Sequence, residues 1–274
     1  MDISIIVPTY KPDYYIWECL ESLKNQSLDR EKYEVLIILN GEKENYYSNI
    51  KSWIEKNKVK NFEILYTKIS GVSNARNIGL DNSNGKYIVF IDDDDYIDKN
   101  YLKELLKKNN EIGENGIVIT NYISFDENTK KELFRTNYRL GEIEENIYKK
   151  RKVFSMGCIK SIPRKIIGDI RFNSKFKNGE DSLFMTEISR SISKIGTVDK
   201  EVIYHRRVRR NSANFKKKKI KEIFSNALKL EKEHLKLFFR KKYDKKFIII
   251  RMLAIVKGSL YQLKNIRGNT WFIF

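Results

Sequence analysis

The sequence predicts an α/β protein whose central sheet is mostly parallel and is flanked by helices. Short apolar runs of strand length, rich in β-branched and aromatic residues, recur through its N-terminal third. Between them lie segments whose apolar residues are spaced as on one face of a helix. Strands and helices that alternate in this way form parallel sheets with helices on the faces. We expect strands over residues 4–7, 34–39, 62–67 and 87–91, and helices over residues 14–24, 46–56 and 73–80.

A helix is predicted between the first two strands along the sequence. Residues 4–7 read Ser-Ile-Ile-Val, a buried-strand pattern that we expect to stop at Pro8, because proline has no backbone N–H. Residues 14–24 follow with apolar side chains at helical spacing. The second strand, residues 34–39, ends at an Asn-Gly pair that is typical of a turn.

The next elements repeat this alternation. Residues 46–56 have aromatic and apolar side chains at helical spacing, and residues 62–67 form the third strand. A short helix over 73–80 precedes the fourth strand, 87–91, which reads Tyr-Ile-Val-Phe-Ile. The carboxyl ends of such strands form the edge at which open α/β sheets bind ligands.

Four consecutive aspartates, Asp92 to Asp95, directly follow the fourth strand. Carboxylates crowded in this way raise the free energy unless a cation compensates their charge. A hard divalent ion, held by one or two carboxylates together with water and the phosphates of a ligand, is the usual cation. The alternative for the cluster alone is a solvated acidic turn or a helix cap.

Four motifs stand in a fixed order along the chain: SIIVPTY at 4–10, GVSNARNIG at 71–79, GKYIVFIDDDD at 85–95 and GEDSLF at 179–184. Together they give the chain a resemblance to the family 2 glycosyltransferases, which have the nucleotide-binding GT-A fold. The resemblance covers most of residues 2–184, and a weaker similarity follows at residues 204–212. It implies transfer of a sugar from a nucleotide-diphosphate sugar, expected to be a UDP-sugar, with inversion and with Mn²⁺ or Mg²⁺ as cofactor.

The resemblance implies a nucleotide site at the ends of the first strands. Pro8, Thr9 and Tyr10 match the family's nucleotide-cradling loop. Asn40 stands where the family often has an aspartate that reads the base, and its amide can still accept a pyrimidine N–H. Arg76 is expected near the nucleotide, where a guanidinium suits phosphate or a base carbonyl. Its alternative is an ion pair with a carboxylate on a helix surface.

The family's D-x-D motif maps onto Asp92 and Asp94. The resemblance implies that Asp94 is the direct metal ligand and that Asp92 or Asp93 faces the ribose or the waters of the metal. A metal that spans the diphosphate neutralises the charge of the leaving nucleoside diphosphate. We expect Asp95 to cap a helix that begins near Asp98.

The second acidic motif is Glu180-Asp181. A sugar hydroxyl is a poor nucleophile and needs a base within hydrogen-bond reach. By resemblance, Asp181 is the catalytic base and Glu180 orients the acceptor. The alternative is a helix start, because acidic residues favour the first turn of a helix.

An arginine-rich segment follows a strand that we expect over residues 197–204. The family has an arginine before an Asn-Ser pair in a flexible loop that closes over the diphosphate, and this alignment selects Arg207. Additional arginines at 206, 209 and 210 leave open which one contacts phosphate. His205 is a candidate metal or phosphate ligand, although a single histidine at a strand end is more often structural.

The charge of the chain is concentrated at its C-terminal end. Lysine and arginine number 54 against 36 acidic residues, a net charge of +18. Residues 206–274 hold 21 basic and 4 acidic side chains, giving +17, whereas residues 1–205 hold 33 and 32, giving +1. We therefore expect a catalytic domain over 1–205, with a nucleotide-binding half (1–100) and an acceptor half (101–205), and a basic helical extension over 206–274.

The extension begins at Lys216 to Lys219 and has apolar residues at helical spacing, with a second helix over 247–263. Its longest uncharged run is far shorter than the roughly 20 residues that span a bilayer. We therefore expect an interfacial helix pair on an anionic membrane surface, on the cytoplasmic face of the cell membrane. The alternative is a helical subdomain that packs its apolar face on the sheet.

The expected partners are a nucleotide-sugar donor and a glycan or lipid-linked glycan acceptor of a surface polysaccharide. A basic tail also fits nucleic acid, but no nucleic-acid motif is recognised and that class leaves the acidic motifs unexplained. A nucleotidyltransferase also uses paired aspartates, but the first strand is not followed by the glycine-rich loop of that class. Two cysteines, Cys19 and Cys158, make no disulfide framework, and no signal-peptide pattern precedes the first strand.

Overall fold

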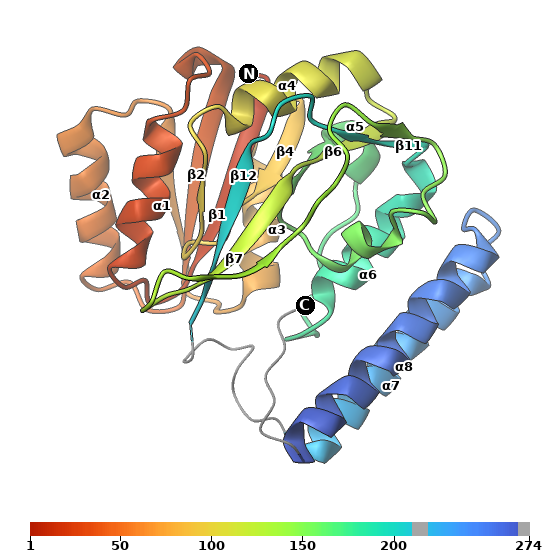
Figure 1. The fold of residues 1–274 in the computed structure, drawn as a ribbon. Coiled ribbons are helices and arrows are strands. Elements are labelled where there is room, and N and C mark those ends of the chain that lie inside the picture. The colour runs from red at the N-terminus through yellow and green to blue at the C-terminus, as the bar shows by residue number, and fades with distance from the viewer. Residues whose placement is uncertain (210–218, 268–274) are drawn as a thin grey trace.

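The computed structural model describes residues 1–209 and 219–267. Two sheets lie at its centre, with helices on the faces of the larger one (Figure 1). The helices are α1 (Tyr15–Lys24), α2 (Tyr46–Asn57), α3 (Val72–Asn82), α4 (Tyr101–Ile112), α5 (Arg164–Ile167), α6 (Glu180–Ile188), α7 (Ile220–Phe238) and α8 (Lys245–Arg267). The strands are β1 (Ile3–Thr9), β2 (Tyr33–Asn40), β3 (Phe62–Thr67), β4 (Tyr87–Phe90), β5 (Tyr96–Ile97), β6 (Gly116–Ile119), β7 (Asn121–Asp126), β8 (Glu132–Arg135), β9 (Ile143–Glu144), β10 (Lys160–Pro163), β11 (Lys194–Thr197) and β12 (Ile203–Val208).

The larger sheet has eight strands in the order β3-β2-β1-β4-β10-β6-β11-β9. β1 is parallel to β2 and β4, and β2 is parallel to β3, so the N-terminal strands form one parallel block. β10 is antiparallel to both of its neighbours, and β9 forms an antiparallel edge. The predicted α/β class with a mostly parallel sheet is confirmed, and so are all four strands and three helices predicted for the N-terminal third.

The first strand does not stop at Pro8, as the sequence predicted, but continues to Thr9. Pro8 lies opposite Ile38 in the register of β1 with β2. Its backbone faces the same side of β1 as Ile6, whose carbonyl accepts from the Ile91 N–H at 3.1 Å. β4 ends at Phe90, so at the level of Pro8 a backbone N–H would have no strand to donate to. The missing N–H of proline therefore costs no hydrogen bond here.

The prediction of a single strand over residues 197–204 is wrong, because two separate strands lie at the ends of this segment. β11 ends at Thr197 and belongs to the large sheet, where it runs parallel to β6. β12 begins at Ile203 and belongs to the second sheet, where it runs parallel to β7. The five residues between the two strands, 198–202, include Asp199, Lys200 and Glu201, and they carry the chain from one sheet to the other.

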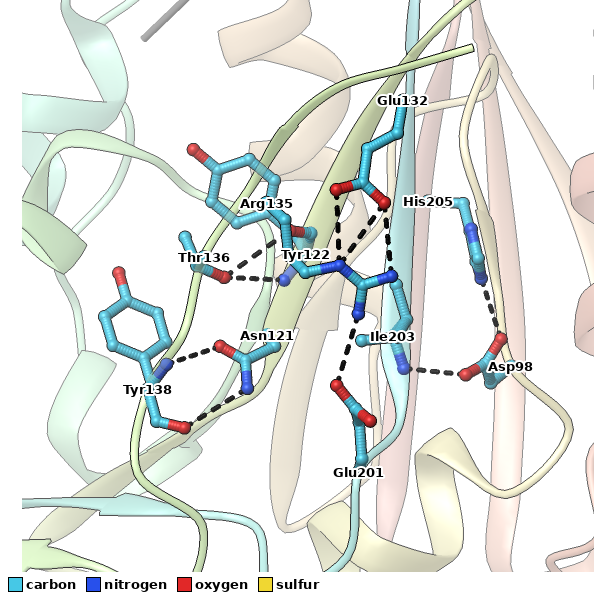
Figure 2. Close-up of polar contacts among 10 residues, drawn as sticks. All are labelled: Asp98, Asn121, Tyr122, Glu132, Arg135, Thr136, Tyr138, Glu201, Ile203 and His205. Atoms are coloured by element: carbon cyan, nitrogen blue, oxygen red, sulfur yellow. Dashed lines mark hydrogen bonds and ion pairs between the residues drawn. The ribbon is translucent and has the colours of Figure 1, made fainter. Parts of the chain in front are cut away.

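The second sheet has the order β5-β12-β7-β8. β5 directly follows the four aspartates and pairs with β12, so the second sheet holds β12 beside the aspartate cluster. Polar contacts link the segments that follow β5 and β8 to the inner strands β12 and β7 (Figure 2). Arg135 of β8 pairs with Glu132 and with Glu201, and the Tyr138 N–H donates to Asn121 Oδ1 at 2.7 Å.

Three aromatic rings fix α6 against the carboxyl end of β4. Phe172 stacks on Phe184 of α6 with ring centroids 3.9 Å apart, and Phe90 of β4 meets Phe172 edge-on at 5.3 Å. All three rings belong to one hydrophobic cluster that extends from Ile3 to Phe247. This contact brings the second acidic motif, at the start of α6, to the edge of the sheet where the aspartates lie.

α7 and α8 lie side by side as a long hairpin next to α6 (Figure 1). Phe247 packs on Phe154 with ring centroids 5.0 Å apart, and the buried Arg251 donates to Ser182 Oγ of α6 at 2.6 Å. The hairpin therefore packs on α6 and on the segment around Phe154, and not with its apolar face on the sheet, as the alternative for the extension had it. Within the described ranges, no helix is long and apolar enough to cross a membrane. Lys216, Lys217 and Lys218 lie outside those ranges.

Candidate active site

The carboxyl ends of β1, β2 and β4 lie at one edge of the large sheet, and polar residues connect them. Thr9 at the end of β1 is buried, and its hydroxyl donates to the carboxylate of Asp93. The side chain of Asn40, at the end of β2, donates to the Thr9 carbonyl at 2.6 Å and accepts from the Gly71 N–H at 2.8 Å. Three residues predicted for the nucleotide site, Thr9, Asn40 and Asp93, are thus brought together.

Asn40 and Tyr10 differ in what they offer a ligand. Asn40 is buried, and both groups of its amide already bond to backbone, so it joins two loops instead of presenting the free base-reading edge that we expected. Tyr10 is 52% exposed and lies against Gly41, where an added Cβ would come within 2.8 Å of the ring. Gly41 has φ +89°, a backbone conformation that favours glycine, so it leaves room for the Tyr10 ring.

Arg76 of α3 connects the two acidic motifs. Its Nη2 lies 3.0 Å from Asp92 Oδ1, while its Nη1 lies 2.5 Å from Asp181 Oδ1 and 3.5 Å from Glu180 Oε1. The guanidinium is buried, with its carbon 5.3 Å from the centre of the Phe172 ring. Arg76 therefore lies beneath the site as a shared counterion, and not on a helix surface as the alternative reading had it.

Asp181 and Glu180 occupy the first turn of α6 after Gly179, which has φ +85°. Asp181 Oδ2 accepts from the Gly157 N–H at 3.1 Å, so the carboxylate is held between a buried arginine and a backbone donor. Burial and the charge of Asp181, partly offset by Arg76, raise the pKa of Glu180 to about 7. The two neighbouring carboxyl groups thus have different environments, which suits an assignment of different roles.

The turn that presents Gly157 is itself held by Lys160, which sequence reasoning did not single out. The Lys160 ammonium is buried in β10 and donates to the carbonyls of Met156 at 2.5 Å and Cys158 at 2.9 Å. Burial lowers its pKa to about 8. Ile159 has φ +65°, a strained conformation for a β-branched residue. The only signal in the sequence was the similarity of residues 155–160 to the family's segment before the Glu-Asp pair.

The aspartate cluster carries more negative charge than its surroundings compensate. Burial and the charge of Asp94 raise the pKa of Asp93 to about 8, and burial and the charge of Asp92 raise that of Asp94. Among the described residues, Arg209 is the cation closest to Asp94, with Nη2 2.5 Å and Nε 2.8 Å from Asp94 Oδ2. Its guanidinium also lies over the Tyr15 ring, 4.2 Å from the centroid.

Asp95 does not cap a helix, contrary to the sequence-based expectation. It is buried and accepts from the Tyr204 hydroxyl at 2.7 Å and from the Arg207 N–H at 2.7 Å. α4 begins only at Tyr101, after Asn100. The pairing of β5 with β12 turns Asp95 inward, so this carboxylate fixes β12 to the aspartate cluster.

The segment predicted as a flexible loop at residues 204–212 begins as a strand, because β12 continues to Val208. Arg207 is buried there, and its guanidinium pairs with Glu18 and donates to the Asp94 carbonyl at 2.8 Å. Arg209, one of the alternatives to Arg207, contacts the Asp94 carboxylate of the D-x-D motif. Residues 210, 211 and 212 lie outside the described ranges.

His205 is held on the opposite side of β12 from Tyr204, among residues of the second sheet (Figure 2). Its Nε2 lies 2.7 Å from Asp98 Oδ1, and its ring stacks on Tyr96 at 4.4 Å. Asp98 Oδ2 also accepts from the Ile203 N–H at 2.8 Å. These contacts agree with the structural role that the sequence offered as the alternative to metal binding.

The residues present fit a divalent cation that is shared with a ligand. Asp92 and Asp94 offer hard carboxylate oxygens, and burial together with the neighbouring carboxylates raises the pKa values of Asp93 and Asp94, a penalty that a bound cation would offset. In the described part of the chain, no three His, Cys, Asp or Glu side chains are grouped so that they could hold a metal by themselves. A cation here would therefore take its remaining ligands from water or from a bound phosphate.

The amino-acid sequence is similar to a known family and to several named proteins. The family model described as "Glycosyl transferase family 2" matches residues 4–171, more than half of the chain. The glycosyltransferase GlyA of Streptococcus pneumoniae is 29% identical over 224 residues, which are 77% of this chain and 31% of that protein. The poly(ribitol-phosphate) β-N-acetylglucosaminyltransferase TarS of Staphylococcus aureus is 24% identical over 207 residues, covering 75% of this chain and 35% of TarS.

Solved structures with the same fold extend the match to the C-terminal helices. S. aureus TarS 1–349 in complex with UDP-GlcNAc superposes with a TM-score of 0.74 at 20% identity, over 93% of this chain and 72% of that one. The mannosyltransferase PcManGT of Pyrobaculum calidifontis, in complex with GDP-Man and Mn²⁺, gives a TM-score of 0.64 at 15% identity, over 98% and 76%. These likenesses show the GT-A fold. The chain spans only 24–36% of the length of the first curated relatives that it matches.

Proposed function

The chain belongs to glycosyl transferase family 2, and on this basis we propose that it transfers a sugar from a nucleotide-diphosphate sugar to a hydroxyl group of a glycan or lipid-linked glycan. The observation that carries the proposal is the position of Arg76, which contacts Asp92 on the donor side and Asp181 on the acceptor side. A direct transfer needs the leaving group and the incoming hydroxyl on opposite sides of one carbon atom. One buried arginine between the two acidic motifs sets that spacing.

The donor is proposed to be a UDP-sugar, since TarS structures hold UDP and UDP-GlcNAc. The nucleotide would lie across the carboxyl ends of β1, β2 and β4, with the accessible Tyr10 ring beside the base and the Pro8–Thr9 backbone below it. Asn40 would shape this loop, because its amide is bonded to backbone on both sides. Asp92 and Asp93 would face the ribose and the waters of the cation.

Asp94 and Asp92 would hold Mn²⁺ or Mg²⁺ together with the diphosphate. When bound, the cation supplies positive charge to the leaving nucleoside diphosphate. Arg209 contacts Asp94 in this structure and is therefore the best-placed of the arginines to contact the diphosphate once a cation takes its place at Asp94. Arg207 pairs with Glu18 and donates to the Asp94 carbonyl, so it would hold the backbone of Asp94 in place.

Asp181 is proposed as the general base. Its carboxylate would take the proton of the acceptor hydroxyl while that oxygen forms a bond to the anomeric carbon. The bond from this carbon to the diphosphate oxygen breaks in the same step, and the diphosphate leaves with the electron pair. A single displacement of this kind inverts the configuration at the anomeric carbon. Arg76 and the Gly157 N–H hold the Asp181 carboxylate in place for this role.

The C-terminal hairpin is proposed to lie on the cytoplasmic face of the cell membrane. Leu228 of α7 is 70% exposed and Leu253 of α8 is 63% exposed, within a row of exposed apolar side chains on each helix. Basic residues flank both rows, a combination that binds anionic lipid surfaces. The proposed division is a catalytic domain over 1–205, with a nucleotide half (1–100) and an acceptor half (101–205), and an extension over 206–274. Because β12 continues to Val208, the end of this strand belongs with the catalytic domain.

A donor screen tests the proposal directly. The full chain is incubated with Mn²⁺ and with UDP-, GDP- and dTDP-sugars in turn, and the released nucleotide is identified. Release of a nucleoside diphosphate from one of these donors is the expected result. Formation of pyrophosphate from a nucleoside triphosphate and a sugar phosphate would instead indicate a nucleotidyltransferase.

A further inference from the structure

A basic groove opens between the start of α6 and the C-terminal hairpin. It has a volume of about 910 Å³ and is lined by the residues that precede α6 and by one face of α7 and of α8. Ser182, the residue after the proposed base, and Gly179, two residues before it, both line the groove. When the reacting hydroxyl of an acceptor lies at Asp181, this groove is next to it. The groove can therefore hold the portion of the acceptor beyond the reacting sugar.

The lysines of the groove have no acidic partners. Lys175, Lys177, Lys221 and Lys229 line it and are exposed, and none of them has an ion pair in the described part of the chain. Lysines elsewhere are often paired, as in the Lys86–Glu114 contact at 2.9 Å. The sole acidic side chain among the described lining residues is Glu222, whose carboxylate accepts from the Lys219 N–H at 3.2 Å.

Arg251 adds a buried positive charge to the wall of the groove. It is 3% exposed and donates to Ser182 Oγ at 2.6 Å, to Ser155 Oγ at 3.2 Å and to the Phe154 carbonyl at 3.1 Å. All of these acceptors are neutral, so its charge is not cancelled locally. Burial lowers its pKa to about 10, which leaves it protonated at neutral pH. It also ties α8 to α6, and so fixes the groove relative to Asp181.

The apolar face of the hairpin points away from this groove. Successive residues of a helix are rotated by about 100°, so Leu253 lies roughly 160° around α8 from Arg251. The exposed Leu228 and Phe224 of α7 are likewise rotated away from Asn226 and Leu230, which line the groove. Lys221, seven residues before Leu228, lies at the border between the two faces of α7. The hairpin therefore has an apolar outer face that suits a membrane and a basic inner face that needs another ligand.

We propose that the groove binds phosphate carried by the acceptor next to the sugar that reacts at Asp181. This inference rests on the proposed glycosyltransferase function and names its acceptor class: a glycan that carries either phosphodiester links or a lipid diphosphate. Unpaired lysines around a fixed arginine favour the charge and oxygen atoms of phosphate over a neutral glycan. Two or more lysines acting on one phosphate group make this binding sensitive to salt.

Binding to two phosphate probes tests the groove. The full chain, with UDP and Mn²⁺ present, is titrated with a short glycerol-phosphate oligomer and with geranyl diphosphate, and an uncharged oligosaccharide serves as reference. We expect one phosphate probe to bind, and the probe that binds distinguishes the phosphodiester source from the lipid diphosphate. The double variant Lys177→Gln/Lys229→Gln should weaken that binding by about tenfold at low salt.

The matched control is Lys232→Gln/Lys257→Gln, which removes two exposed lysines from α7 and α8 outside the groove. It should change binding of the phosphate probe less than about twofold. Equal effects of the two double variants, or no binding of either phosphate probe, would overturn the groove proposal. So would a loss of binding to anionic vesicles in the groove variant with unchanged binding of the probe. Binding of UDP is measured in every variant, so failure of the nucleotide site is distinguished from failure of the groove.

Discussion

Arg76 Nη1 lies 2.5 Å from Asp181 Oδ1, although the two residues are 105 positions apart in the sequence. The same guanidinium contacts Asp92, so the arginine of the third helix joins the carboxylate that follows β4 to the carboxylate that begins α6. Both acidic motifs were predicted from the sequence as separate sites. Their connection through one buried cation is what the structure adds, and it makes the relative position of donor and acceptor groups depend on Arg76.

Arg76→Lys should cost most of the activity while preserving the charge. A lysine ammonium cannot contact two carboxylates on opposite sides as the planar guanidinium does. We expect kcat to fall about 100-fold, a magnitude typical of misplaced catalytic groups. Breaking such a buried ion pair altogether, in Arg76→Met, should lower the free energy of unfolding by about 3–5 kcal/mol. Turnover of Arg76→Lys within about twofold of the parent would show that the shared contact is not needed.

Asp94→Asn should remove the dependence on a divalent cation together with the activity. The side chain keeps its size but loses the charge that binds the cation and that pairs with Arg209. Nucleotide-sugar turnover should fall at least about 100-fold, because the leaving group loses its charge compensation. The control is Asp81→Asn, which removes an exposed carboxylate that pairs with Arg171. Full activity of the parent protein in excess EDTA would contradict the metal assignment.

Glu180 should make the protein less stable as the pH rises through neutrality. Its folded-state pKa, about 7, lies above the ordinary 4.5, so between these values the folded state binds more protons than the unfolded state. The stability that the neutral carboxyl contributes is thus fully present below pH 4.5 and is lost as the pH rises through 7. Glu180→Gln should raise the free energy of unfolding above pH 7 by at most about 3 kcal/mol, and leave it unchanged near pH 4. Chemical denaturation at pH 5, 6, 7 and 8 measures the slope; equal slopes for parent and variant would contradict the shift.

The outer face of the hairpin should give the protein a salt-resistant affinity for anionic vesicles. Leu228→Ser/Leu253→Ser removes two large exposed apolar side chains and should abolish the part of vesicle co-sedimentation that survives high salt. Leu133→Ser, an exposed apolar position on β8, is the control and should have no effect. Lack of binding of the parent protein to anionic vesicles at any salt concentration would remove the basis for a membrane-facing hairpin.

Much of the fold followed from local patterns in the sequence. Strands and helices up to Ile91 have strong apolar periodicity, and each predicted element is present within a few residues at its ends. The prediction of one strand over 197–204 was wrong because the charged residues 199–201 form a connection between two sheets, and local composition does not show which sheet each flanking strand joins. The prediction that Asp95 caps a helix was wrong for a related reason. The inward orientation of Asp95 depends on β12, which pairs with β5 from more than 100 residues away.

The candidate site was predicted in its residue types but not in its connections. The motifs identified the aspartates, Arg76 and the Glu-Asp pair, whereas Lys160 and Gly157 carry no pattern of their own. A buried lysine that holds two carbonyls, and a backbone N–H that bonds to a carboxylate, are tertiary contacts that a sequence does not display. Arg209 was among several arginines, and only its distance from Asp94 separates it from its neighbours.

The configuration of the product tests the central claim most directly. A donor that the screen has shown to be turned over, for example an α-linked UDP-sugar, is incubated with an acceptor, and the anomeric configuration of the new bond is read by NMR. A β-linked product is expected from the parent protein, with a rate that falls by about 10² to 10⁴ in Asp181→Asn while UDP binding is retained. An α-linked product, or an Asp181→Asn variant as active as the parent, would contradict a single displacement driven by Asp181.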